Sequence, residues 1–418
     1  MRQRRADPNQ KMENASEDPN APGALMLPPG EIERWVRDFH DERARSGGWP
    51  TIYVRKRDAS NIALLLADEE ETVSGFDAVG LGAAPRGHQH SRRPPRQRFP
   101  RAGDKVVKKE GTGPGARGYQ GIVYAITFAR ELRRRGVTCS QRELYYNYKG
   151  DGESPWRSQA ECNESIADAA AIFGRPRFAL GFTTAPRGMV AGLVSWRGAG
   201  QRDWTSARGT ARHVDHGWLT DGARQLRSEA RCVVVVEKEG VFQRLVEDNF
   251  YDDAYPCVLV TAMGVPDLAT RAFVHRLRAT LGLPVYGLVD WNSWGVGVLL
   301  TYKLGSARLG VESHRYTVDV AWLGLRASQI DRFDVPDVCM QPLTARDKKR
   351  GEGIMAHPWV AGRRDWLDEI QAQLDKDFKC ELEAMALAPP RERGRGKLSF
   401  QNLSHFVEEA IVARDWLE

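Results

Sequence analysis

Long hydrophobic runs are absent from this sequence of 418 residues. No apolar stretch approaches the roughly 18 to 20 residues that a membrane-spanning helix needs, and the first twenty residues lack the apolar segment of a signal peptide. Cysteine is scarce as well, because the six cysteines are scattered and no two of them are spaced as Cys-x-x-Cys. We therefore expect no disulfide framework, no thiolate zinc site and no membrane association, but a soluble intracellular protein.

A strong excess of one charge sign is also missing from the chain as a whole, whose net charge is +6. Residues 80–118 nevertheless hold ten basic and two acidic side chains, so the rest of the chain is slightly acidic. This stretch is rich in Pro and Gly and poor in apolar residues, and it cannot bury enough surface to offset the entropy lost on ordering. We predict a flexible basic linker, which is either a solvated spacer, a polyanion-binding arm or a nuclear import signal.

The sequence does contain 41% hydrophobic side chains, enough for two or three domains. We predict that residues 1–117 are largely disordered and basic, with a short amphipathic helix in EIERWVRDFHDERAR and an apolar run, NIALLLA. The main boundary is predicted near Gly118.

The pattern of residues 118–200 predicts a winged-helix DNA-binding domain of the α+β class. An amphipathic helix is expected from Tyr119 to Gly136, and a second helix from Ser140, because Ser140-Gln-Arg-Glu143 fits a capping box. A third helical stretch, ECNESIADAAAIF, precedes two strand-like runs, RFALGFTTA and GMVAGLVSW, that a Pro-Arg-Gly turn separates. Three helices followed by two strands are the order of a winged helix.

The pattern of residues 229–418 predicts an α/β domain with a parallel sheet, after a Gly/Arg-rich connector at 201–228. Unbroken apolar runs such as CVVVV, CVLVT, VYGLV and VAWLGL alternate with helical segments. Strands that are buried on both faces have such runs, and their alternation with helices indicates βαβ crossovers. The segment DWLDEIQAQLDKDFKCELEAMA is predicted to form an amphipathic helix that completes the domain.

Oxygen-bearing side chains follow two of these strands. Glu237 comes directly after CVVVV, and Asp290 and Asn292 follow VYGLV in the segment DWNSWG. Ligands bind at the carboxyl ends of parallel strands, and these oxygens suit a hard divalent ion such as Mg²⁺. The alternative is that each acidic residue caps the helix that follows it.

Two tyrosines lie on the second helix of the predicted winged-helix domain. Tyr146 is four residues after Arg142, on the same helical face, and a guanidinium there would stabilise a phenolate or bind a phosphate. Tyr145 points about 100° away around the helix. The alternative for both tyrosines is packing in the core of the domain.

Two families share these motifs in this order. Arg142-Glu-Leu-Tyr-Tyr146, VVVVEKEGVFQRLVE and GLVDWNSWGVGVLLTYKLGS resemble the A subunit of archaeal topoisomerase VI and its eukaryotic relatives, the sporulation protein eleven family of meiotic recombination initiators. The resemblance covers about residues 118–345. It implies a winged-helix domain followed by a topoisomerase-primase (Toprim) domain, with Tyr146 as the nucleophile, Arg142 beside it, and Mg²⁺ or Mn²⁺ held by Glu237, Asp290 and Asn292.

The resemblance further implies a nuclear transesterase that makes meiotic DNA double-strand breaks and stays linked to DNA through a 5′-phosphotyrosine. It implies double-stranded DNA as the partner, a homodimer during cleavage, accessory recombination proteins and a topoisomerase VI B-like subunit. Alternatives are a topoisomerase VI A subunit that reseals DNA, a non-catalytic DNA-binding scaffold, and a metal-dependent nuclease or primase. The family commonly has Asp where this chain has Asn292, so we expect an active but metal-sensitive enzyme.

Two further groups are weaker candidates. Arg133, Arg134 and Arg135 end the first predicted helix, where cations complement the helix dipole and would also face DNA phosphates. His213 and His216 have a ligand-like spacing, but we favour a surface or DNA-facing loop over zinc because no third ligand is near in the sequence.

Overall fold

The computed structural model describes residues 26–54, 105–107, 114–149, 154–184, 186–220, 224–305, 316–386 and 402–418. Contacts between residues divide the chain into two units, of which the first includes residues up to Thr184 and the second the residues from Ala185, apart from a short segment after Gly305. Most of the predicted basic linker, and the run NIALLLA, lie outside the described residues. None of the described helices has the length and apolarity that crossing a bilayer requires.

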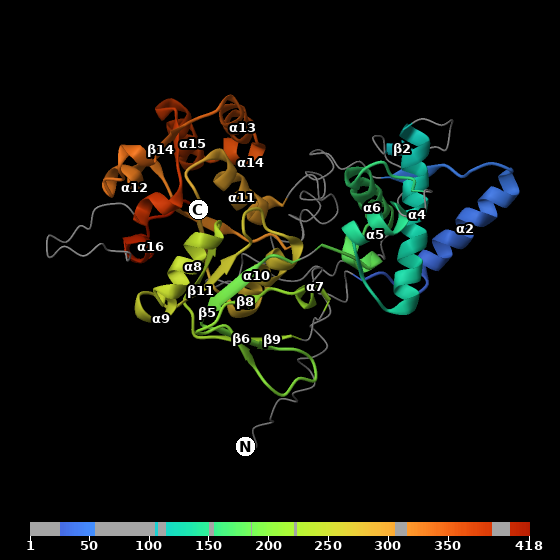
Figure 1. The fold of residues 1–418 in the computed structure, drawn as a ribbon, viewed down its shortest axis with the longest axis horizontal. Helices are drawn as coiled ribbons and strands as arrows, with labels where there is room; N and C mark the ends of the chain where they lie inside the picture. The colour runs from blue at the N-terminus through green and yellow to red at the C-terminus, as the bar shows by residue number, and fades with distance from the viewer. Residues whose placement is uncertain are drawn as a thin grey trace, which may run out of the picture. The chain divides into compact units, whose positions relative to one another are not determined.

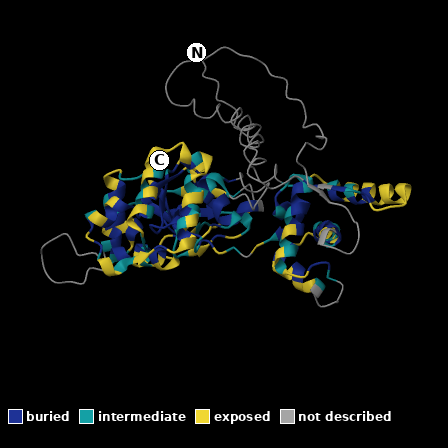
Figure 2. Ribbon diagram, turned by 90° about the horizontal axis from the view of Figure 1, so that it is seen from above, coloured by how far each residue is buried: buried dark blue, intermediate teal, exposed yellow. Residues whose placement is uncertain are grey.

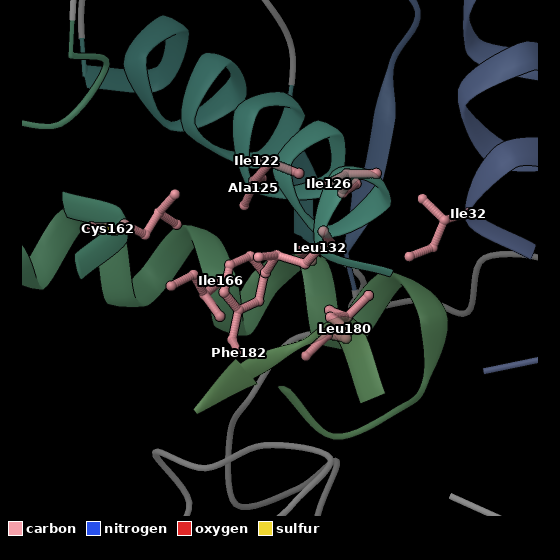
Figure 3. Packing of buried hydrophobic residues seen from close by; sticks show 14 of the residues in the cluster. Ile32, Ile122, Ala125, Ile126, Leu132, Cys162, Ile166, Leu180 and Phe182 are labelled. Carbon is pink, nitrogen blue, oxygen red and sulfur yellow. The ribbon is translucent and has the colours of Figure 1, made fainter. Parts of the chain in front are cut away.

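The first unit is mainly helical. Its elements (Figure 1) are α2 (Glu31–Ser46), β1 (Ile52–Val54), β2 (Lys105–Val107), α4 (Pro114–Arg135), β3 (Cys139–Ser140), α5 (Gln141–Lys149), α6 (Gln159–Phe173), the 3-10 helix η3 (Arg177–Leu180) and β4 (Phe182–Thr183). Figure 3 shows apolar side chains of α2, α4, α6, η3 and β4 meeting in one core, among them Ile122, Ile166 and Phe182. The three predicted helices are therefore confirmed as α4, α5 and α6.

The helix α4 begins earlier than the sequence predicts. It starts at Pro114, so the predicted boundary near Gly118 lies inside a helix. Proline is well suited to the first turn of a helix, where its missing N–H has no intrahelical partner. The predicted end at Gly136 is confirmed, since Gly136 has the positive φ of 67° that glycine tolerates.

The two strands of the predicted wing do not pair with each other. In the first run, η3 is followed by the short strand β4, which pairs in parallel with β3. In the second run, β5 (Met189–Gly192) pairs with a strand of the second unit, and the boundary predicted at residue 200 is wrong. A Cβ at Gly192 would lie 2.5 Å from the Cys257 carbonyl oxygen, so this apolar run fits directly against the sheet.

The second unit is an α/β domain, as predicted, around a six-stranded sheet in the order β13-β12-β10-β11-β5-β8. The four strands β13, β12, β10 and β11 are parallel neighbours, whereas β5 and β8 are antiparallel. Every residue of β10–β13 is buried, which explains their unbroken apolar sequences. Figure 2 shows these buried strands in dark blue, with exposed helix faces around them.

The strands of the second unit begin with elements that the sequence predicts as a wing and a connector. The bounds are β5 (Met189–Gly192), β6 (Val194–Arg197), β7 (Thr205–Ser206), β8 (Arg212–His213), β9 (Gln225–Ser228), β10 (Cys232–Val236), β11 (Cys257–Thr261), β12 (Val285–Leu288), β13 (Val320–Gly324), β14 (Met340–Pro342) and β15 (Phe378–Cys380). Strands β7, β6 and β9 form a separate small sheet. The residues predicted as a connector are thus partly ordered as strands.

Helices connect and cover these strands. They are α7 (Gly217–Thr220), α8 (Glu239–Glu247), α9 (Phe250–Asp253), α10 (Leu268–Leu281), α11 (Ser293–Leu304), α12 (Ala327–Arg332), η5 (Asp337–Cys339), α13 (Ala345–Met355), α14 (Pro358–Ala361), α15 (Arg364–Lys376), η6 (Leu382–Ala386) and α16 (Asn402–Val412). The single helix predicted for residues 365–386 is wrong in its second half. Helix α15 ends at Lys376, the next residue, Asp377, has a φ of 56°, and β15 then pairs with β14. Long-range strand pairing leaves no local periodicity that the sequence could reveal.

Candidate active site

The short helix α5 presents Tyr146 and Arg142 on its exposed face. The predicted capping box starts this helix, since Ser140 Oγ accepts the Glu143 N–H at 3.1 Å and Glu143 Oε2 accepts the Ser140 N–H at 3.3 Å. The side chain of Tyr146 is 52% exposed, which is unusual for a large apolar residue of this fold. The Arg142 guanidinium lies 5.6 Å from the centre of the Tyr146 ring. A cation is thus held beside an accessible phenol.

The neighbouring tyrosine has a different environment. Tyr145 is buried, and its hydroxyl donates to the carbonyl oxygen of Arg157 at 3.4 Å. The core-packing alternative therefore describes Tyr145, whereas Tyr146 lies outside the core. This division follows from the 100° turn between consecutive helical residues.

The three arginines at the end of α4 have two kinds of contact. Arg133 donates to the carbonyl oxygens of Ala179 and Leu27, so it ties the helix end to two other segments. Arg134 and Arg135 are exposed and share Glu131, with Arg134 bonded to both carboxylate oxygens at 2.8 Å. Hydrogen bonds from Arg134 and Arg135 lower the pKa of Glu131 to about 2. Arg134 and Arg135 remain accessible candidates for DNA contact.

Glu237 and Asp290 converge at the carboxyl ends of the neighbouring parallel strands β10 and β12. Glu237 Oε2 accepts the backbone N–H of Asp290 at 3.0 Å, and the Glu237 N–H donates to Leu288. Neither carboxylate caps a helix: Lys238 occupies the N-cap of α8, and Asn292 that of α11. The structure therefore brings the two acidic residues together and does not support the alternative that they are helix caps.

Burial makes both carboxylates hard to ionise. It raises the pKa of Glu237 to about 7, with the charge of Asp290 adding to the rise. Burial also raises the pKa of Asp290, although the Leu382 N–H and Lys238 oppose this rise. Two buried carboxylates side by side are costly without a compensating cation.

Asn292 belongs to the same cluster but uses its oxygen differently from the prediction. Its Oδ1 accepts the N–H groups of Trp294 and Gly295, each at 2.8 Å, and so caps α11. Its Nδ2 lies 3.5 Å from Asp290 Oδ2. The oxygen expected to bind a metal is thus engaged by the backbone.

Gly295 keeps the site open. A Cβ at this position would lie 2.4 Å from the Asp290 carbonyl oxygen and 3.1 Å from Glu237 Oε2. The glycine of DWNSWG is therefore required because the start of α11 passes close to the Asp290 backbone carbonyl and the Glu237 carboxylate.

Three charged residues beside this pair were not predicted from the sequence. Lys238 Nζ lies 3.1 Å from Asp290 Oδ2, 3.1 Å from Glu381 Oε2 and 2.8 Å from Glu383 Oε2. The two glutamates reach the site because they directly follow β15, where Cys380 and Trp291 exchange backbone hydrogen bonds. Leu382 then donates its N–H to Asp290 Oδ1 at 2.9 Å. In the sequence, nothing marks Lys238 as a residue of the site except its position next to Glu237.

Glu237 and Asp290 are oxygen donors of the kind that a hard divalent ion prefers. Glycine at position 295 places no side-chain carbon against Glu237 Oε2. In the described part of the chain, no three His, Cys, Asp or Glu side chains are grouped as a metal site.

His213, a candidate from the sequence, is exposed on β8, and Asp215 two residues later pairs with Arg224 at 2.8 Å.

Comparison with known proteins covers both units. Residues 118–182 match the family described as "Type IIB DNA topoisomerase", and residues 232–390 match the Toprim domain of the family that unites Spo11 with the A subunit of topoisomerase 6. The chain is 34% identical over 267 residues to meiotic recombination protein SPO11-2 of Arabidopsis thaliana, an alignment that covers 63% of this chain and 68% of that protein.

The chain belongs to this family of Spo11 and topoisomerase 6 proteins. It is also 31% identical to the A3 subunit of DNA topoisomerase 6 of Oryza sativa over 70% of this chain and 63% of that protein. Meiotic recombination protein SPO11 of Mus musculus is 30% identical over 64% of this chain and 66% of that protein. Tyr146 and Arg142 lie in the first matched region, and Glu237, Asp290 and Asn292 in the second. The resemblance read from the motifs is thereby confirmed.

Proposed function

We propose that this chain initiates homologous recombination by making meiotic double-strand breaks in DNA, in the nucleus. Its similarity to proteins named meiotic recombination protein SPO11 supports this reading. The observation that carries the chemistry is the exposed Tyr146 beside Arg142, within the region that matches type IIB topoisomerases. A DNA strand has access to a phenol in this position.

The proposed reaction is a transesterification. The Tyr146 oxygen attacks a backbone phosphorus, the bond from phosphorus to the 3′ oxygen breaks, and the phenolic proton ends on that oxygen. The products are a 5′-phosphotyrosyl link and a free 3′ hydroxyl, and neither water nor ATP is consumed. Arg142 would stabilise the phenolate or hold the phosphate through its planar guanidinium.

Glu237 and Asp290 are the residues that would hold Mg²⁺ or Mn²⁺. When bound, the ion neutralises negative charge on the phosphate that reacts. The carboxylates must be ionised to hold it, so the raised pKa of Glu237 makes binding sensitive to pH. Asn292 would act on the position of α11 rather than as a ligand, because its Oδ1 caps that helix.

Helices α4–α6 are proposed to bind double-stranded DNA as a winged-helix-type module, with Arg134 and Arg135 as candidate phosphate contacts. One tyrosine cuts one strand, so two copies of the chain are needed for a double-strand break, and a homodimer is proposed during cleavage. Accessory recombination proteins and a topoisomerase VI B-like subunit complete the proposed assembly.

The experiment that tests this function uses duplex DNA labelled at either end of a strand. After incubation with the protein, its B-like partner and Mg²⁺, followed by denaturation, 3′-labelled strands should migrate with the protein. Strands labelled at the 5′ end should appear as shorter free fragments. Free fragments from both labels would indicate hydrolysis by a nuclease and would contradict the proposal.

A second candidate is the A subunit of a type IIB topoisomerase, which the similarity to the A3 subunit of DNA topoisomerase 6 supports. Such an enzyme would use the same residues but reseal the DNA. ATP-dependent relaxation of supercoiled DNA in the presence of a B subunit would favour this candidate over a break-making enzyme.

A further inference from the structure

The ammonium of Lys238 lies among three carboxylates that come from two separate segments of the second unit. Its distances are 3.1 Å to Asp290 Oδ2, 3.1 Å to Glu381 Oε2 and 2.8 Å to Glu383 Oε2. Lys238 follows β10, Asp290 follows β12, and the glutamates follow β15. The contact with Glu383 is a charge-assisted hydrogen bond, and Lys238 also forms ion pairs with Asp290 and Glu381.

The three carboxylates differ in their exposure. The side chain of Asp290 is 5% exposed, whereas those of Glu381 and Glu383 are 46% and 52% exposed. The charge of Asp290 therefore depends on Lys238 for compensation, whereas water also solvates the two glutamates. Lys238 itself has a flexible four-carbon stem and is 25% exposed, so its ammonium has room to shift between them.

A divalent ion and this ammonium would compete for Asp290. Asp290 Oδ1 already accepts the Leu382 N–H at 2.9 Å, and Oδ2 accepts from Lys238. The carboxylate keeps further lone pairs, but a divalent ion on Asp290 and the ammonium beside it would repel each other. Binding of the ion therefore favours movement of the ammonium away from Asp290.

We propose that Lys238 is an exchangeable counter-cation of the metal site, which Glu381 and Glu383 retain when the ion takes Asp290. This proposal rests on the proposed function, because it takes Glu237 and Asp290 as the residues that hold the ion. The two glutamates make the exchange easier: Lys238 gives up one of its three carboxylates and keeps the other two. Lys238 and the glutamates thus act as positioning residues that set the metal affinity.

The test measures Mn²⁺ binding to the full chain by electron paramagnetic resonance, without DNA. Lys238→Met should bind Mn²⁺ about tenfold more tightly than the wild type, because the competing cation is gone. Lys238→Arg is the matched control that keeps the charge, and it should stay closer to the wild type than Lys238→Met does. Unchanged or weaker binding by Lys238→Met would overturn the proposal.

A double-mutant cycle tests whether Glu381 and Glu383 affect the metal affinity through Lys238. The pair Glu381→Gln and Glu383→Gln should weaken Mn²⁺ binding about tenfold in the wild-type background, because Lys238 then has no second holding place. In the Lys238→Met background the same pair should weaken binding by less than about threefold. An equal effect in both backgrounds would mean that the glutamates act only through their charge, and would overturn this part.

Two further measurements distinguish failure of the exchange from failure of the proposed metal site and from misfolding of the variants. Glu237→Gln should abolish Mn²⁺ binding; if it does so while Lys238→Met has no effect, the exchange fails and the metal site stands. If Glu237→Gln binds Mn²⁺ as well as the wild type does, or if neither binds it, both the exchange and the proposed metal site are wrong. Lys238→Met should also melt at a lower temperature than the wild type without metal, and saturating Mn²⁺ should reduce this difference.

Discussion

At the scale of single residues, the site depends on two carboxylates that only a compensating charge makes tolerable. Glu237 and Asp290 are buried side by side, and their pKa values are raised as a result. Lys238 contacts Asp290 at 3.1 Å, and Asn292 adds a neutral amide where a further carboxylate would add a negative charge. Substitutions that add negative charge here should therefore raise the metal affinity and lower the stability of the metal-free protein.

Asn292→Asp should strengthen metal binding and weaken the metal-free protein. An aspartate would still cap α11, but it would place a third negative charge near Asp290. We expect the metal-free variant to lose about 1 kcal/mol of unfolding free energy and its melting temperature to rise more with Mg²⁺ than that of the wild type. Thermal unfolding with and without Mg²⁺ measures both effects.

The control for this variant is Asn292→Ala, which removes the cap and adds no charge. It should lose about 0.5 to 2 kcal/mol without gaining any response to Mg²⁺. If Asn292→Asp behaves like Asn292→Ala, the position has no influence on the metal.

Gly295→Ala should disrupt the site by overpacking. Its Cβ would lie 2.4 Å from the Asp290 carbonyl oxygen, so the start of α11 must shift, at a cost of about 1 to 3 kcal/mol. Gly353→Ala is the matched control in α13, because no atom lies within 4 Å of the added Cβ, and it should be neutral or stabilise by up to about 1 kcal/mol. Chemical denaturation compares the two. Equal stabilities would contradict the close approach at Gly295.

Much of this site could be predicted from the sequence, and the missing part has a clear cause. Glu237 and Asp290 each follow an unbroken apolar run, so their place at one edge of the sheet follows from the periodicity. The cap made by Asn292 is a matter of side-chain rotation, which no pattern of residue types fixes. Glu381 and Glu383 were missed because they reach the site through pairing between distant strands.

At the scale of elements, α13 shows how one helix start depends on ionisation. Burial alone would raise the pKa of Asp347, but hydrogen bonds from Thr344 and Lys379 outweigh it and lower this pKa to about 2. Thr344 and Asp347 form a reciprocal capping box. Helix α13 packs against α11, whose first turn covers the carboxylates. The capped start of α13 thus helps to hold α11, and with it the carboxylate site, in place.

Acid should weaken this support in a defined pH range. The folded pKa of Asp347 lies below the unfolded value of about 3.9, so its contribution is complete above about pH 4 and is lost as the pH falls towards 2. Asp347→Asn should be about 1 kcal/mol less stable than the wild type at pH 7, and the difference should shrink between pH 4 and 2. Urea unfolding at several pH values measures it. A difference that is constant with pH would contradict the charged cap.

The elements that the sequence predicted correctly are those with strong local patterns. The capping box at Ser140 and the buried strands β10–β13 have such patterns. The strand β5 was misassigned to a wing because its apolar run fits an isolated hairpin and a sheet edge equally well. Pairing with β11, 66 or more residues along the chain, decides its place.

At the scale of the whole molecule, we propose that the homodimer pairs the tyrosine of one copy with the metal site of the other, as the resemblance to the topoisomerase VI A subunit implies. This arrangement predicts the behaviour of mixed dimers. When Tyr146→Phe and Glu237→Gln chains are combined, one composite site carries both defects and the other carries none, so single-strand cleavage with a covalent adduct should appear.

The controls are the two variants alone, each of which should form no adduct. Gel separation of denatured products from the mixture and from each variant makes the comparison. If the mixture also forms no adduct while mixing with wild-type chains does, tyrosine and metal site act within one copy.

Comparison of Tyr146→Phe with Tyr145→Phe shows which tyrosine attacks DNA. Both variants lose one hydroxyl from the same helix, but Tyr146 is exposed beside Arg142, whereas Tyr145 is buried. Each is incubated with end-labelled duplex DNA, Mg²⁺ and the B-like partner, and DNA binding is recorded in parallel. We predict that Tyr146→Phe binds DNA and forms no covalent adduct, while Tyr145→Phe still forms one. An adduct with Tyr146→Phe would contradict it.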